Sequence, residues 1–585
     1  MDQEISRIKL NKLYAEDDIF KEIIFYDGIN IILGEKYDNT NSAGRKTNGV
    51  GKSMCIEFID FCLLGKYSDS RVSKIPEEIL PVDKYIMLDL EIGDNCLTIK
   101  RNRKSPESVV IIRNDKKCEF DDLNSARNYL TEMIFKNMNG QMIPSFRSLL
   151  SLLVRDERSE FVDILKCHEA TKRIPIDFTP HLYFFRISIE LYKEMIKTIK
   201  EIEIISKVIS REKRELTENG KKKMDEVKAQ FNSMSDELNK LEQAIDNFKS
   251  NEAFNSLEKE LIQLETQLDE LREEQKIVRY EYNKIKTLPK PERIDDKEVE
   301  LVYNHFKTDL GSAIVKNFND VLAFKNKVEE FQNVLINQKA KELENKLDEI
   351  TKKIRLYDDE YAEKVKIIDK KGVLKNLKSS LKIYEDKKES FSHLKFLFQQ
   401  YDKNDKTKKL LSLERTKETL EMDGVLEQID HIIASFTDSL LGIHESIMGN
   451  QECSFEIKTV ENPKRKDPIE INMRIFDDGS HSVNRTKVFI YDVALMFNKY
   501  TRIRHPLFLI HDNIFDVDQD TLVQCLNYLQ TQEEKYRDFQ YILTLNRDKI
   551  ENEEKRQLVN LDIDAHTVAI FTKKNKFLNV DYQEK

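Results

Sequence analysis

The hexapeptide NGVGKS is the part of the sequence whose residue types point most directly to chemistry. Asn48, Gly49 and Gly51 would allow the backbone N–H groups of a loop to surround a triphosphate. Lys52 would then reach the β- and γ-phosphate oxygens, and Ser53 would be a ligand for Mg²⁺. The sequence therefore predicts a site for ATP and Mg²⁺.

The neighbours of this hexapeptide have the character that a phosphate-binding loop requires. The apolar segment INIIL before it is typical of a buried strand, and SMCIEFIDF, which begins at Ser53, is typical of a buried helix. The pattern G-x-x-x-x-G-K-[ST] asks for a glycine where this chain has Lys46. Because Gly34 ends the predicted strand, we expect it to make the first turn and residues 35–46 to form an insertion at the mouth of the site.

A second apolar segment, PLFLIHDN, ends in groups that can hold a metal ion or orient water. Two registers are open. In one, Asp512 is the Mg²⁺ ligand and Asn513 stands where a water-orienting carboxylate is expected, which predicts weak hydrolysis. In the other, His511 takes the metal position and Asp512 orients water. Asp512 is thus a candidate catalytic residue in both, and a strand followed by a helix-capping aspartate is the structural alternative.

A third candidate is the start of the helix predicted around VNRTKVFIYDVALM. Ser482, Asn484 and Arg485 lie where a helix N-terminus would present N–H groups and a hydroxyl to a phosphate. An ordinary helix capped by a serine explains the same pattern without a ligand.

The composition predicts long, exposed helices between two mixed lobes. Charged residues make up 35% of the chain, which has only 15 glycines and 11 prolines in 585 residues. Apolar residues at heptad spacing form one seam beginning at Val227, Phe231, Met234 and Leu238 and a second that includes Phe324, Val328, Phe331 and Leu335. We therefore predict lobes at 1–190 and 426–585, coiled-coil arms at 191–286 and 321–425, and an apex at 287–320. A compact helical bundle is the alternative for the middle region.

Charge and cysteine usage exclude several other classes of protein. The net charge of −10 provides no overall basic field, so DNA binding would need a local patch. None of the seven cysteines forms a C-x-x-C pair, which argues against a zinc site and a disulfide framework. No apolar run approaches the length of a membrane span, so we expect a cytoplasmic protein with no membrane partner.

With these motifs in this order, the chain resembles the SMC/SbcC-like branch of ABC ATPases. SFRSLLSLLVRDE, VNRTKVFIYDVAL and FLIHDNIFDVDQD look like its YydD-like subgroup, which has relatives in bacterial anti-phage defence systems of the Lamassu and ABC-three-component types. The resemblance implies an α/β fold with a long coiled coil, in which the N- and C-terminal lobes form one ABC-type head and an antiparallel coiled-coil hairpin separates them. It also implies a homodimer that joins through its heads around ATP, binding of double-stranded DNA, and smaller accessory or effector subunits.

The resemblance assigns further residues. Asp518, seven residues after His511, matches a second aspartate of the family and slightly favours the register with His511 at the metal. HSVNR stands where the family has LSGGE, the signature that clamps the ATP of the other subunit. Asn546 lies at the switch position that senses the γ-phosphate, whereas Gln141 and Arg155 are poor candidates for the glutamine loop. The altered motifs imply slow turnover, so a nucleotide-binding scaffold and a DNA-repair ATPase of the SbcC/RecN type are the alternatives.

Overall fold

The computed structural model divides the chain into two units. It describes residues 4–36, 49–135, 141–167, 169–249, 258–287, 318–368, 373–462, 465–477, 479–551 and 553–580. The head contains the described residues up to Ile196 and from Lys417 onward, and the arm contains those between Lys197 and Thr416.

A five-stranded parallel sheet to which both ends of the chain contribute forms the centre of the head. Its strand order is β13 (Thr567–Phe571), β3 (Gly28–Gly34), β12 (Gln540–Asn546), β11 (Phe508–His511) and β8 (Val154–Arg155). The three inner strands are buried along almost their whole length, as expected for strands covered on both faces. The predicted fold class, one α/β head assembled from N- and C-terminal lobes, is confirmed.

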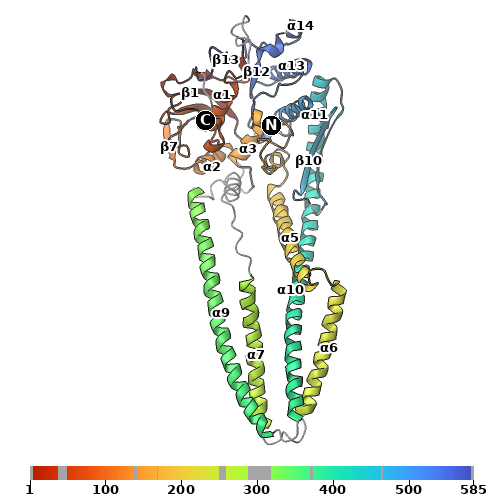
Figure 1. Cartoon of the computed structure of the whole chain (residues 1–585). Helices are drawn as coiled ribbons and strands as arrows, with labels where there is room; N and C mark the ends of the chain where they lie inside the picture. Colours follow the sequence, from red (N-terminus) through yellow and green to blue (C-terminus); the bar gives the residue numbers. More distant parts are fainter. Residues whose placement is uncertain are drawn as a thin grey trace. The chain divides into compact units, whose positions relative to one another are not determined.

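A second, antiparallel sheet and several helices complete the head (Figure 1). The sheet runs in the order β2 (Ile23–Ile24), β1 (Ile8–Ala15), β4 (Ile86–Ile92), β5 (Asn95–Arg101), β6 (Val109–Arg113) and β7 (Lys116–Phe120). The helices are α1 (Lys52–Cys62), α2 (Leu123–Ile134), α3 (Phe146–Leu153), α4 (Thr179–Phe184), α11 (Asp430–Met448), α12 (His481–Phe497), α13 (Gln519–Lys535) and α14 (Glu553–Arg556). The predicted hairpins are present as β4–β5 and as β9 (Cys453–Thr459) with β10 (Ile469–Ile475).

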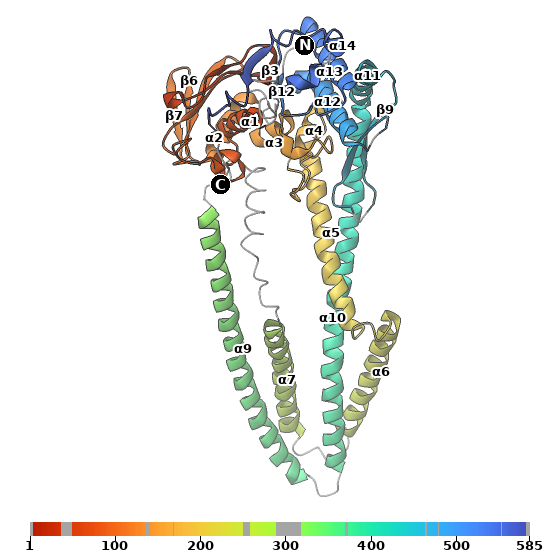
Figure 2. The same cartoon turned by 45° about the horizontal axis from the view of Figure 1, so that its top comes forward.

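The arm is built from long helices in antiparallel register. They are α5 (Ile189–Leu216), α6 (Met224–Lys249), α7 (Glu258–Lys286), α9 (Phe318–Ile368) and α10 (Val373–Gln428), of which α5 and α10 extend into both units. Figures 1 and 2 both show α7 beside α9 and α6 beside α10. In the first pair Gln275 donates to Thr351 at 2.8 Å, and in the second the rings of Phe231 and Phe391 stack with centroids 4.8 Å apart.

The two helix pairs also contact each other. Tyr280 on α7 packs on Phe396 of α10 with ring centroids 4.5 Å apart, and Arg272 on α7 forms an ion pair with Glu385 of α10. Ile245, Leu261 and their apolar neighbours join α6, α7, α9 and α10 in one cluster. These pairings are those of the predicted antiparallel coiled-coil hairpin, and α6, α7, α9 and α10 also share one apolar cluster.

Heptad positions are buried through much of the arm but not throughout. Val227, Leu238 and Leu268 are buried, whereas Phe231, Met234 and Leu241 of the first seam are only partly buried. Phe331 and Leu335, also assigned to a seam, are 62% and 46% exposed. The predicted apex, 287–320, also lies outside those ranges except at its two ends. Among the described helices, none has the length and apolarity needed to cross a bilayer.

Candidate nucleotide site

The predicted phosphate-binding residues lie at the carboxyl edge of the parallel sheet. Gly34 at the end of β3 pairs with Asn546 on one side and Phe571 on the other. Asp512 follows directly after β11, which pairs with β12. Ligands of open parallel sheets bind at this edge, because the loops that follow neighbouring strands meet there.

The loop before α1 requires glycine for two reasons. Gly49 and Gly51 have φ values of 68° and 107°, in the left-handed region that other residues rarely adopt. A Cβ on Gly51, which caps α1, would lie 2.6 Å from the Cβ of Phe577. Asn48 and residues 37–46 of the predicted insertion lie outside the described ranges.

Lys52 extends into the site. Its side chain is largely buried, and Nζ donates to Oδ1 of Asn546 at 2.5 Å, so these two predicted phosphate contacts are brought together. Burial lowers the pKa of Lys52, and the nearby carboxylates of Asp512, Asp548 and Glu157 oppose that change. An ammonium group among carboxylates at a sheet edge is suited to phosphate oxygens.

Asp512 and Ser53 supply oxygen ligands of the kind that Mg²⁺ prefers. The Asp512 carboxylate is 1% exposed and accepts hydrogen bonds from Thr544 Oγ1, at 2.8 Å, and from the Ser53 hydroxyl. Burial raises the pKa of Asp512 to about 6, against these hydrogen bonds. A hard cation would favour the charged carboxylate, so the hydroxyl and carboxylate pair fits Mg²⁺. Thr544 was not among the predicted residues, although alternation along β12 places it on the same row as Asn546.

His511 points away from this pair. Its Nε2–H donates to Asp492 Oδ2 at 2.9 Å, and its Nδ1 accepts from the Tyr541 hydroxyl at 2.9 Å. Burial lowers the pKa of His511, which keeps the ring neutral, and Asp492 also forms a buried ion pair with Arg155 at 2.6 Å. Because side chains alternate along a strand, His511 and Asp512 face opposite sides of the sheet. The slightly favoured register was therefore wrong: His511 is not placed to be a metal ligand or a catalytic residue, and the geometry fits Asp512 at the metal and Asn513 at the following position.

Glu157 is a site residue that sequence reasoning missed. It begins η4 (Glu157–Ser159), directly after β8 and Asp156, and β8 pairs with β11. Its Oε2 lies 3.5 Å from Ser53 Oγ, and its Oε1 accepts from Asn513 Nδ2 at 3.3 Å. Gln141 and Arg155, the poor candidates for the glutamine loop, are not seen to contact the site. Arg155 forms an ion pair with Asp492, and Gln141 is exposed.

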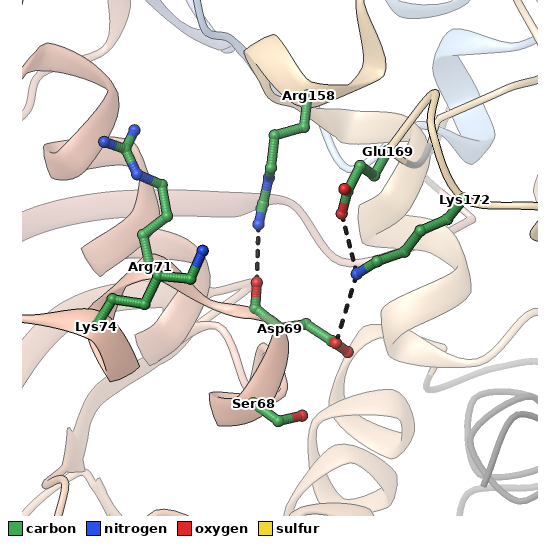
Figure 3. A pocket seen from close by; sticks show the side chains of 7 residues that line it. All are labelled: Ser68, Asp69, Arg71, Lys74, Arg158, Glu169 and Lys172. Atoms are coloured by element: carbon green, nitrogen blue, oxygen red, sulfur yellow. Dashed lines mark hydrogen bonds and ion pairs between the residues drawn. The ribbon is translucent and has the colours of Figure 1, made fainter. Parts of the chain in front are cut away.

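The loop that carries Glu157 is anchored by its neighbour Arg158. Arg158 donates to the backbone oxygen of Asp69 at 2.8 Å (Figure 3). Both residues line a hollow of about 520 Å³. Arg158 also forms ion pairs with Asp156 and, at 2.8 Å, with Glu57 of α1. These contacts attach the Glu157 loop to the helix that begins with Lys52 and Ser53.

The signature-like helix contacts the same site. Ser480 caps α12 by accepting from the Val483 N–H at 3.2 Å, so Ser482 and Asn484 lie inside its first turns, both half-buried. Arg485 donates to the backbone oxygen of Asn513, and its guanidinium lies over the ring of Phe161. A serine cap, the structural alternative, is therefore present, although the capping residue is Ser480.

Asp518 has a structural contact. It caps α13 by accepting from the N–H of Thr521 at 2.9 Å and from its hydroxyl at 2.6 Å. These contacts hold its carboxylate at the start of α13 rather than beside Lys52 or Ser53.

Comparison with known proteins finds similarity to one family of uncharacterised proteins and to two individual proteins. A family described as "Uncharacterised protein conserved in bacteria (DUF2326)" matches residues 443–582. The chain is 21% identical over 572 residues to the uncharacterized protein YydD of Bacillus subtilis, covering 91% of this chain and 92% of that protein. It is 25% identical over 202 residues to a DNA double-strand break repair Rad50 ATPase of Thermoplasma acidophilum, covering 34% of this chain and 20% of that protein.

Two solved structures align over most of the chain. The Smc head domain with a coiled coil and joint derived from Pyrococcus yayanosii gives a TM-score of 0.36 at 12% identity, over 94% of both chains. The Smc head domain with an extended coiled coil bound to the C-terminal domain of ScpA, derived from Pyrococcus furiosus, gives 0.30 at 10% identity, over 93% of this chain and 90% of that one.

Proposed function

We propose that this chain is an SMC/Rad50-like ATPase that binds Mg²⁺ and ATP at the carboxyl edge of its parallel sheet. The observation that supports the proposal is the convergence of Lys52, Ser53 and Asp512, which come from the two ends of the chain. The Ser53 hydroxyl hydrogen-bonds Asp512, and burial holds both Asp512 and Lys52 away from bulk solvent. In this site Lys52 and Asn546 contact phosphate oxygens, Ser53 and Asp512 hold Mg²⁺, and the bound ion neutralises phosphate charge.

The first experiment compares the unaltered 585-residue protein with its Lys52→Ala variant. Isothermal titration with Mg²⁺ and a non-hydrolysable ATP analogue measures binding, and phosphate release measures turnover. We expect Lys52→Ala to lose both, because no ammonium then balances the phosphate charge. Lys66→Ala, which removes a lysine beyond the end of α1, is the matched control. Normal binding and turnover by Lys52→Ala would refute the proposal.

At a finer level, we propose that ATP joins the heads of two copies and that the dimer engages double-stranded DNA and controls smaller partner or effector subunits in bacterial anti-phage defence. This part is supported by the resemblance in motif order to the SMC/SbcC-like ATPases. Light scattering with and without the ATP analogue tests dimerisation, and DNA-stimulated turnover tests DNA engagement. A protein that stays monomeric with the ATP analogue, and whose turnover does not change with DNA, would contradict this part of the proposal without contradicting the nucleotide site.

Two alternatives have support of their own. Asn513, an amide beside the metal ligand Asp512, favours a scaffold that binds ATP with little turnover, and binding without phosphate release would identify it. The similarity to a Rad50 ATPase favours a role in DNA repair. Recovery of partners from the native host distinguishes repair from defence, because repair nucleases and defence effectors are different proteins.

A further inference from the structure

Hydrolysis of ATP needs a group that orients the attacking water. The end of β11 supplies only one carboxylate, Asp512, and its oxygens are committed to Thr544 and Ser53. The next residue, Asn513, has an amide, which orients water less effectively than a carboxylate. The site described from β11 alone therefore lacks a group for this step.

Glu157 supplies a carboxylate from the neighbouring strand. β8 lies beside β11 in parallel register, so the residues that follow the two strands meet at the same edge. Asn513 Nδ2 donates to one Glu157 oxygen at 3.3 Å, and the other oxygen is 3.5 Å from Ser53 Oγ. Both contacts are with neutral groups, and Glu157 is exposed.

The surroundings of Glu157 hold it in this position. Asp156 caps the turn by accepting from the Arg158 N–H at 3.1 Å, and Arg158 is tied to Glu57 on α1. Ser53 lies one turn before Glu57 on the same helix. The contacts of its two neighbours in sequence, Asp156 and Arg158, therefore fix the position of Glu157 relative to the phosphate loop.

We propose that Glu157 is the residue that orients the attacking water, in place of the carboxylate that Asn513 lacks. The inference rests on the proposed ATP hydrolysis at this site. Glu157 accepts a hydrogen bond from the water, whose oxygen forms a bond to the γ-phosphorus as the bond from the γ-phosphorus to the β–γ bridging oxygen breaks. ADP and inorganic phosphate leave, and the proton lost by the water passes to solvent.

The variant Glu157→Gln tests this role, because glutamine keeps the shape of the side chain but is a weaker hydrogen-bond acceptor. We expect turnover to fall roughly a hundredfold or more, as for other groups that assist attack. Binding of the ATP analogue with Mg²⁺, measured by titration and by its shift of the thermal midpoint, should stay within about twofold of the unaltered protein. Glu160→Gln, an exposed glutamate on the same turn, is the matched control and should change neither.

A second variant separates a missing carboxylate from a disturbed loop. In Glu157→Gln with Asn513→Glu, the carboxylate returns on β11 and the amide moves to the β8 loop, so we expect at least tenfold recovery of turnover over Glu157→Gln alone. Unchanged turnover in Glu157→Gln, loss of nucleotide binding, or no recovery in the double variant would each overturn the assignment. If the unaltered protein binds ATP through Lys52 without measurable turnover, this inference fails while nucleotide binding stands. If Lys52→Ala changes neither nucleotide binding nor turnover, the proposed function itself is refuted, whatever the Glu157 variants show.

Discussion

The buried ion pair between Arg155 and Asp492 gives the sharpest test of how the head is held together. Both side chains are at most 1% exposed, with contacts of 2.6 and 2.9 Å, and Asp492 also accepts from His511. Asp492→Asn keeps the shape but leaves the Arg155 charge buried without a counter-ion. Removing one partner of such a pair costs about 3–5 kcal/mol, a large part of the roughly 5–15 kcal/mol that stabilises a domain.

Hydrogen exchange of the amides in β11 and β12 measures this loss in the head without interference from the arm. The expected cost corresponds to exchange faster by roughly two to three and a half orders of magnitude, at about 1.4 kcal/mol for each factor of ten. The control is Asp538→Asn, whose ion pair with Arg502 has the aspartate 61% exposed and should be worth about 0–1 kcal/mol. Equal exchange in the two variants would refute the reasoning, because it would mean that burial adds nothing to the pair.

Two further predictions concern other parts of the molecule. Glu533 accepts hydrogen bonds from His566 and from the Ile29 N–H, each at 2.8 Å. The hydrogen bond with Glu533 raises the pKa of His566 in the folded protein. The stability that this pair adds to the fold is therefore complete below the unfolded pKa of about 6.5 and is lost as the pH rises through the folded pKa. The thermal midpoint of the head, followed between about pH 5.5 and 8.5, should show this decline in the unaltered protein, whereas a parallel decline in Glu533→Gln would contradict it. In the arm, Phe231 stacks on Phe391 and packs at a tilt against Phe398, so Phe231→Ala should lower the free energy of unfolding in urea, followed by circular dichroism, by about 2 kcal/mol. Phe331→Ala, at a position 62% exposed, should cost less than about 0.5 kcal/mol, and equal costs would show that the described arm packing is wrong.

Local chemistry explains which site residues could be predicted from the sequence. Lys52 and Ser53 were identifiable because a phosphate loop is continuous in the chain and lies between an apolar strand and an apolar helix. Asp512 was identifiable because it ends a run of apolar residues. The direction of the His511 side chain was not, since it depends on how β11 pairs with β12 and β8 and on the buried acceptor Asp492, which lies in another element.

The role of Glu157 and the contact between α7 and α10 could not be predicted, for a related reason. β8 has only two residues, too few to show any periodicity, and Glu157 becomes part of the site solely because β8 pairs with β11. The heptad seams predicted the pairing of neighbouring helices, which is encoded at spacings of three and four residues. The contact between α7 and α10 involves Tyr280 and Phe396, which lie outside the predicted heptad seams, so the heptad spacing does not indicate it.

α12 contacts both sides of the β11 terminus. From one side, its Asp492 holds His511 and also Arg155, whose backbone oxygen accepts from the Asp512 N–H at 2.9 Å. From the other side, its Arg485 donates to the backbone oxygen of Asn513, whose side chain in turn donates to Glu157. A displacement of α12 therefore has to break a buried ion pair or move the residues around Asp512. Because the N-terminus of this helix is the predicted contact with a second head, the proposed dimer would act on the metal ligand and on the water-orienting carboxylate through these same two contacts.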